Sequence, residues 1–235
     1  MVHRLFFAGH SSLEYGIYIS GTDTYKGAER VVNYRDVPGR NGSLVQDEGR
    51  YKNISIPYKA FVRRNFPQYS EAARQWLLAP QGYQRLEDDY HLDEYRMAVF
   101  AGPVDFVGRF LNLSGEVTLN FDCMPQRWLK SGEKAISITS GKTLYNAWQP
   151  SEPLIQVVGN GTLHVGKYVV TVKGIPGPEP VSIDSAVSDA WQGTNNRNEN
   201  VELENHQYPI LEPGEVTINY TGFSSVSITP RWWRL

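Results

Sequence analysis

The chain has 235 residues, of which 40% are hydrophobic and 20% are charged, and its formal net charge is −2. This composition is that of a folded globular protein and excludes an intrinsically disordered chain. The net charge excludes a protein that binds nucleic acid or an anionic membrane through a general excess of positive charge. The only cysteine, Cys123, excludes an internal disulfide, and no apolar run approaches the roughly 20 residues that span a bilayer.

The N-terminal region predicts a short strand segment. Residues 6–21 read FFAGHSSLEYGIYISG and are expected to hold this segment. The first residues hold too few consecutive apolar side chains for a secretory signal. We therefore expect that the chain is made in the cytoplasm.

A long β-hairpin is predicted next. The stretch that begins at Pro38 reads PGRNGSLVQDEGRYKNISIPYKAFV, so residues 29–37 form one strand, PGRNG the turn and residues 44–62 the other strand. Pro57 lacks an amide donor, which indicates a sheet edge or a bulge there. An arm of this length cannot bury both faces within one domain, so we expect it to pair with a neighbouring copy. The alternative, a hairpin packed on its own domain, stays open.

The interface residues follow from this hairpin. Its charged residues are candidates for ion pairs that set the register between neighbouring subunits, and the apolar residues of the second strand would add buried area. The predicted interface comprises Arg35, Asp36, Arg40, Asp47, Glu48, Arg50, Tyr51, Ile54, Ile56 and Tyr58.

One convincing helix is predicted, in the stretch PQYSEAARQWLLAPQG that begins at Pro67. Ser70 is the expected N-cap, and a proline and a glycine end the helix. Ala73, Trp76 and Leu77 fall on one face and would pack against a sheet.

The rest of the chain predicts many short strands. Runs such as PLIQVVG, TLHVG, YVVTVKG, VSIDSA and EVTINYTG are bounded by turn residues, a spacing typical of a sandwich or barrel. Asn160-Gly161 predicts a two-residue hairpin turn. Two similar segments, GEVTLNF at residue 115 and GEVTINY at residue 214, begin 99 positions apart. Their similarity arises either by chance or from a duplication. Together with a polar linker near Ser131, this predicts two β-rich domains, 1–130 and 131–235.

No catalytic or metal-binding pattern emerges. The five histidines lack ligand spacing, and we assign no cofactor, metal or catalytic residue and expect no enzyme. The acidic run 86–95, LEDDYHLDEY, fits a solvated loop better than the carboxylate pair of a glycosidase, which stays a weaker alternative. A lectin-like module is the second alternative, because Trp128, Trp148, Trp191, Trp232 and Trp233 could stack on sugar rings.

The order of these segments resembles the distal tail protein family of siphophages. The resemblance rests on FFAGHSSLEYGIYISG, PGRNGSL…EGRYKNISIPY, the helix, FDCMPQRW, PLIQVVGNGTLHV and YPILEPGEVTINYTG…VSITPRWW, in that order over essentially the whole chain. It implies a mainly β protein with an N-terminal β-sandwich-like ring domain, which carries the long arm and the helix, and a C-terminal galectin-like β-sandwich.

The resemblance also implies a function. The chain would form a ring, hexameric in that family, at the distal end of a long non-contractile tail. It would join the tail tube protein to the tail-associated fibre or lysin protein and to receptor-binding proteins, in the virion, with DNA passing through the lumen without specific binding. No membrane partner is expected.

Overall fold

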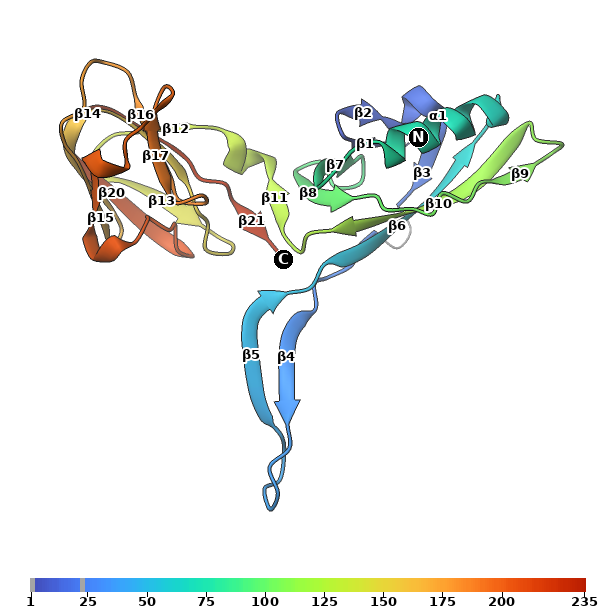
Figure 1. The fold of residues 1–235 in the computed structure, drawn as a ribbon, viewed down its shortest axis with the longest axis horizontal. Coiled ribbons are helices and arrows are strands. Elements are labelled where there is room, and N and C mark those ends of the chain that lie inside the picture. The colour runs from blue at the N-terminus through green and yellow to red at the C-terminus, as the bar shows by residue number, and fades with distance from the viewer. Residues whose placement is uncertain (1–2, 22–23) are drawn as a thin grey trace. The chain divides into compact units, whose positions relative to one another are not determined.

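The computed structural model describes residues 3–21 and 24–235 and divides the chain into two compact units (Figure 1). The first unit runs to Arg127 and includes Leu235, and the second is Trp128–Arg234. Both are built mainly of strands, so the predicted mainly β class is confirmed. Among the described residues there is no helix with the length and apolarity that a membrane crossing requires.

An antiparallel sheet forms the body of the first unit. Its strands follow one another in space as β2-β1-β7-β8-β10-β6-β3, and β9 also pairs with β10. The bounds of these strands are β1 (Leu5–Phe7), β2 (His10–Ser11), β3 (Ile17–Ser20), β6 (Ile54–Val62), β7 (Gln84–Asp88), β8 (Glu94–Val99), β9 (Val107–Arg109) and β10 (Ser114–Cys123). A short helical turn, η1 (Ser12–Tyr15), links β2 to β3.

The sequence alternation of β6 and β10 sets the inner face of this sheet. The two strands pair from Ile54–Cys123 to Val62–Gly115, and every second residue of each is buried. Phe121, at the centre, packs its ring against the rings of Phe7 and Phe100, with centroids 5.0 and 5.1 Å apart. Because burial disfavours the thiolate, the pKa of the Cys123 thiol is raised to about 12.

The predicted helix is present and covers this inner face. It is α1 (Phe66–Leu78), and Ala73, Trp76 and Leu77 are buried as expected. The indole of Trp76 donates a hydrogen bond of 3.0 Å to the carbonyl oxygen of Phe7. The predicted N-cap is wrong, because the helix begins earlier. Ser70 lies inside it, where its hydroxyl donates to the backbone of the first turn.

The arm is a separate two-stranded sheet in the first unit. It consists of β4 (Arg30–Arg35) and β5 (Leu44–Tyr51), which within the described residues pair only with each other. The predicted arm extended to Val62, and this is wrong. After Tyr51 only two residues intervene before the chain enters β6, which belongs to the main sheet.

The second unit is also built of antiparallel strands, ordered β12-β20-β14-β16-β17-β18, with β13 on β20, β15 on β14 and β19 on β15. Their bounds are β12 (Ile136–Ile138), β13 (Lys142–Asn146), β14 (Leu154–Val165), β15 (Tyr168–Val172), β16 (Val181–Asp184), β17 (Asp189–Gln192), β18 (Asn195–Asn196), β19 (Val201–Leu203) and β20 (Gly214–Thr229). The remaining elements are β11 (Arg127–Leu129), which pairs with β21 (Trp233–Arg234), and the turns η2 (Lys130–Glu133), η3 (Asn198–Asn200) and η4 (Glu204–His206).

Two long strands, β14 and β20, hold this second unit together. They pair along most of their length but shift register around Gly159. The predicted hairpin turn at Asn160-Gly161 is wrong, because these residues form an irregularity within β14. The Asn160 side chain is bonded to the backbone of Ile175, accepting from its N–H at 2.8 Å and donating to its carbonyl. An asparagine held this way supports a bulge rather than a reversal of the chain.

Candidate functional site

The tip of the arm is a compact turn. Gly39 and Gly42 both have a φ of 80°, which a glycine adopts without strain. The N–H of Arg40 donates to the carbonyl of Val37 at 3.1 Å. The hydroxyl of Ser43 donates to the carboxylate of Asp36 at 2.7 Å. The PGRNG turn predicted from the sequence therefore lies where the arm reverses.

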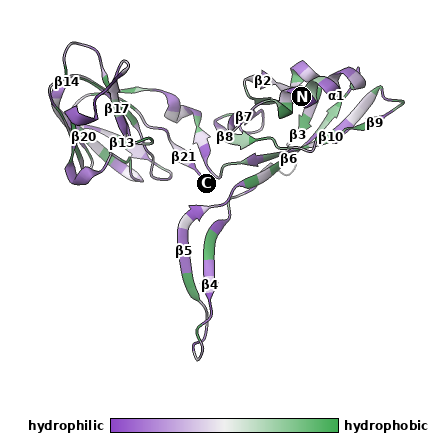
Figure 2. Cartoon of the chain, in the orientation of Figure 1, coloured by the Kyte–Doolittle hydropathy of each residue, from purple (hydrophilic) through white to green (hydrophobic). Residues whose placement is uncertain are grey.

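The two faces of the arm differ in chemistry. Residues that stand opposite each other on antiparallel strands share a face. Val32 is paired with Asp47 and Tyr34 with Val45, so these four residues share one face. Its apolar members Val32, Tyr34 and Val45, which we call the apolar face of the arm, lie beside Asp47, whose charge is paired with Arg30. Figure 2 shows hydrophobic segments on both strands.

In the described chain, two of the three residues of this apolar face are uncovered and Val32 is half-buried. Tyr34 is 71% exposed and Val45 is 57% exposed. The sequence analysis missed these residues because it weighed the charges of the arm. The strand register reveals them, because it places Tyr34 of VVNYR directly opposite Val45 of LVQDE on one face.

Most of the predicted register-setting charges are paired inside the arm itself. Asp47 forms a 2.8 Å ion pair with Arg30. Glu48 forms one of the same length with Arg50 and accepts a 2.8 Å hydrogen bond from the side-chain amide of Asn33. The Asn33 amide, and after it Arg50, lowers the pKa of the Glu48 carboxyl. These contacts stabilise the hairpin of a single chain.

Two of the predicted interface residues are cations that remain free to contact another subunit. In the described part of the chain, the side chains of Arg35 and Arg40 have no hydrogen bond or ion pair, and both are exposed. Tyr51, at the end of β5, lies beside Arg30, whose guanidinium is 5.9 Å from its ring centroid. Tyr51 therefore belongs to the base of the arm.

The last three predicted interface residues are not on the arm. Ile54, Ile56 and Tyr58 lie on β6, are 7%, 1% and 3% exposed, and belong to the core of the first unit. Their placement on the arm is corrected, because β6 turns these side chains toward α1 and the opposite strands. The sequence alternation was read correctly, but the packing partner is this chain's own core.

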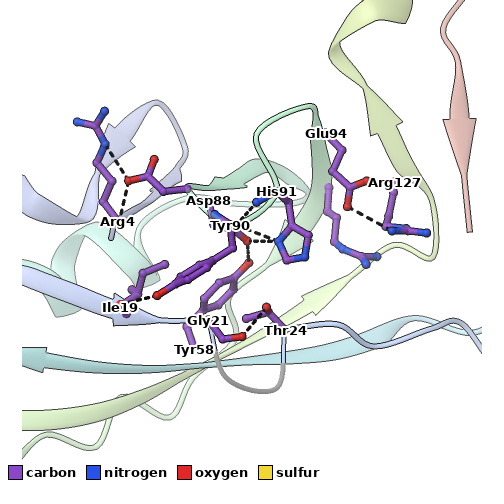
Figure 3. Close-up of polar contacts among 12 residues, drawn as sticks. Arg4, Ile19, Gly21, Thr24, Tyr58, Asp88, Tyr90, His91, Glu94 and Arg127 are labelled. Carbon is purple, nitrogen blue, oxygen red and sulfur yellow. Dashed lines mark hydrogen bonds and ion pairs between the residues drawn. The ribbon is translucent and has the colours of Figure 1, made fainter. Parts of the chain in front are cut away.

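Tyr58 also contacts the acidic run, whose description as a solvated loop is wrong. Asp88 is 7% exposed, and its carboxylate accepts a 2.6 Å hydrogen bond from the Tyr58 hydroxyl, a 2.9 Å bond from the His91 ring and bonds from two backbone N–H groups (Figure 3). Burial would raise the pKa of Asp88, but the bonds from His91 and Tyr58 outweigh it, so that the pKa is lowered. Burial, and next the charge of Asp88, raises the pKa of Tyr58 well above its usual value.

Glu94, the second buried carboxylate of the run, lies 3.5 Å from Arg127 (Figure 3). Both Asp88 and Glu94 thus have structural partners, and the run closes the β7–β8 connection. This use of the carboxylates gives no support to the glycosidase alternative.

A second uncovered apolar surface lies on the first unit, at the turn between β9 and β10. Phe110, Leu111 and Leu113, which we call the apolar turn, are 81%, 98% and 68% exposed. Phe110, Leu111 and Asn112 have φ values of 50°, 54° and 64°, a left-handed conformation that is strained for bulky side chains. An apolar segment held open in this way is typical of a contact site.

Comparisons with known proteins bear on the fold. No protein-family model matches the chain, and no curated protein matches it in sequence. Among solved structures it is similar to the Dit protein of phage SPP1, described as a hub of the adsorption apparatus in phages that infect Gram-positive bacteria. The TM-score is 0.78 at 12% identity, over 97% of this chain and 98% of that one.

Two structures of the phage P2 baseplate in its activated conformation are also similar. The one with Ca has a TM-score of 0.55 at 11% identity, over 100% of this chain and 99% of that one. The one with Sr has a TM-score of 0.54 at 10% identity, over 97% and 98%. The chain therefore has the fold of phage hub and baseplate proteins over its whole length.

Proposed function

We propose that this chain is a structural subunit of the ring at the distal end of a long non-contractile phage tail. The observation that carries the proposal is the fold shared with SPP1 Dit, which extends over 97% of the chain and includes no unmatched domain. The order of sequence segments, which resembles that of siphophage distal tail proteins, supports the same role independently. The role is one of assembly, and no chemical step is assigned to it.

The ring is built by the first unit. A head-to-tail ring needs two different surfaces on each subunit, one for each neighbour. The apolar face of the arm and the apolar turn supply two such surfaces on different elements, and both are exposed in the single chain. The cations Arg35 and Arg40 add charges that can select the register between neighbours. Six subunits is the number that the family resemblance supports.

The partners follow from the place of the ring. The tail tube protein binds one face, the tail-associated fibre or lysin protein the other, and receptor-binding proteins the rim. The protein resides in the virion after synthesis in the bacterial cytoplasm. DNA passes through the lumen, and the net charge of −2 provides no general basic surface that would retain it. The family resemblance supports a galectin-like sandwich for the second unit.

Shortening the arm tests this function. Because Val32 and Asp47 are cross-strand partners, residues 33–46 can be replaced by Asn-Gly, which keeps the Arg30–Asp47 ion pair and closes the strands with a two-residue turn. We expect the parent protein to form closed rings in negative-stain electron microscopy, and the shortened protein to remain a folded monomer by light scattering and circular dichroism. Rings of the shortened protein, or a parent that stays monomeric at every concentration, would contradict the proposal.

A further inference from the structure

A cavity of about 420 Å³ lies in the second unit, apart from the arm and the apolar turn. The turn between β14 and β15, the turn between β16 and β17 and the loop before β20 form its walls. Its volume falls within the range of about 300–1,000 Å³ that small-molecule sites span.

The cavity is lined by polar side chains that the fold leaves without partners. In residues 3–21 and 24–235, six lining residues have no side-chain hydrogen bond or ion pair: Glu152, Ser185, Ser188, His206, Gln207 and Tyr208. Ser185 is only 6% exposed, so its hydroxyl lacks both protein and bulk-water partners. Buried polar groups are normally paired with protein or with water, so the Ser185 hydroxyl is an exception beside the cavity.

The cationic lining residue is, by contrast, already neutralised. Lys167 lies 3.1 Å from the carboxylate of Glu212, which also accepts a 3.0 Å hydrogen bond from the Tyr168 hydroxyl. The free groups are therefore a single carboxylate, an imidazole, an amide and hydroxyls. Such a set offers both donors and acceptors and little net charge.

The walls of the cavity are fixed in advance. Arg231 holds Asp184 through two bonds of 2.6 and 2.7 Å, and Asp184 in turn accepts from the N–H of Ala186, which sets the β16–β17 turn. Two backbone hydrogen bonds between Ser151 and Leu211, of 3.1 and 2.9 Å, hold the opposite loop. A preformed site loses less conformational entropy when it binds a ligand.

The backbone at the rim is also strained. Ser188 and His206 have φ values of 54° and 56°, left-handed for non-glycine residues. Strain of this kind persists where the surrounding structure enforces it, and it gathers at ligand sites. Tyr208 supplies an aromatic ring, half-buried against the core of the second unit.

We propose that this cavity binds one hexose or N-acetylhexosamine unit of a polysaccharide. A pyranose presents hydroxyl groups that both donate and accept hydrogen bonds, which the five unpaired side chains other than the buried Ser185 can satisfy. Its C–H face can pack against the ring of Tyr208. The near-neutral lining favours an uncharged sugar over a phosphate or a basic peptide. The site does not depend on ring formation, and it would remain if the chain proved to have another role.

Saturation-transfer NMR on the full-length protein tests the proposal with the methyl glycosides of glucose, galactose, N-acetylglucosamine and N-acetylgalactosamine. We expect saturation of at least one of these sugars. The double variant Glu152→Gln/Gln207→Ala should weaken that binding at least about tenfold, and Tyr208→Phe should weaken it as well. Glu152 and Gln207 are exposed, so the double variant should fold as the parent does. Tyr145→Ala, an exposed tyrosine of the same unit outside the cavity, should leave binding unchanged.

Two outcomes would overturn the proposal. One is the absence of saturation of all four sugars at millimolar concentration. The other is saturation that persists unchanged in the double variant and in Tyr208→Phe, because the sugar would then bind elsewhere. Circular dichroism of each variant shows whether a loss of binding reflects the site or the fold.

Discussion

At the scale of the residue, Asp88 shows how one buried carboxylate fixes a loop. It accepts hydrogen bonds from Tyr58 on β6 and from His91 in the β7–β8 connection, so it joins two parts of the first unit that are distant in sequence. Because the ionised form accepts these bonds, folding favours ionisation of Asp88.

This predicts a pH dependence of stability. The pKa of Asp88 is lowered in the folded state, so its contribution is fully present above the unfolded value of about 3.9 and is lost as the pH falls through the folded value. At pH 7, Asp88→Asn should lower the free energy of unfolding by about 1–3 kcal/mol, because the donors that face residue 88 lose their carboxylate acceptor. Urea denaturation at neutral and acidic pH measures both quantities.

The matched control is Asp93→Asn, in the same connection but exposed and without a side-chain partner in the described chain. It should change stability by no more than about 0.5 kcal/mol. If the variant at position 88 lost as much stability below pH 4 as the parent loses, Asp88 would not carry this pH dependence.

A second prediction at this scale concerns Gly161. A Cβ at this position would lie closer than van der Waals contact to the carbonyl oxygen of Thr221 on β20. Gly161→Ala should therefore destabilise the second unit by more than about 2 kcal/mol in chemical denaturation, since a rigid backbone has to shift. Gly177→Ala is the comparison, because Gly177 has a φ of 77° but open space around it. It should cost about 1 kcal/mol, from backbone strain alone.

At the scale of the element, the arm gives a test in which its length is unchanged. Tyr34→Ser/Val45→Ser removes the apolar face. The control is Gln46→Ser on the other face, because the Gln46 side chain is exposed and has no hydrogen bond in the described chain. We expect the first variant to weaken self-association at least about tenfold in sedimentation velocity, because apolar area drives such contacts, and the second to assemble as the parent does. Equal effects of the two variants would mean that the apolar face is not the contact.

The arm also shows what the sequence can predict and what it cannot. PGRNG identified the turn, and the alternation of residues 54–62 identified β6, since both are local patterns. The sequence did not reveal where the arm ends, because β5 and β6 form one nearly continuous extended stretch. Their separation depends on pairing with different strands. For the same reason, β14 was predicted as a hairpin, although Gly161 lies against β20 rather than in a turn.

The cavity of the second unit lay beyond sequence prediction altogether. Its lining residues come from segments 152, 167–168, 185–188 and 206–210, which no short motif connects. The acidic run shows the opposite limit: its charges were visible in the sequence, but the partners that bury them, Tyr58 and Arg127, were not.

At the scale of the whole molecule, the two compact units predict independent folding. Each has its own hydrophobic core, one around Phe121 and the other around Ile155. We expect a fragment of residues 128–234 to unfold cooperatively in urea and to be monomeric, and a fragment of residues 1–127 to keep the self-association of the full chain. Size-exclusion chromatography with light scattering decides both. An unfolded or oligomeric 128–234 fragment would show that the units depend on each other.

The short connection between the arm and β6 has a mechanical consequence. Only Lys52 and Asn53 separate the two strands, so tension applied to the arm passes directly into β6. That strand lies between β10 and β3 and is paired with β10 over nine residues. When a strand is pulled along its own axis, the hydrogen bonds that flank it are sheared together instead of being opened one after another. A neighbour that pulls the arm in line with β6 therefore loads all nine β6–β10 residue pairs at once, and the force is carried into the main sheet of the first unit.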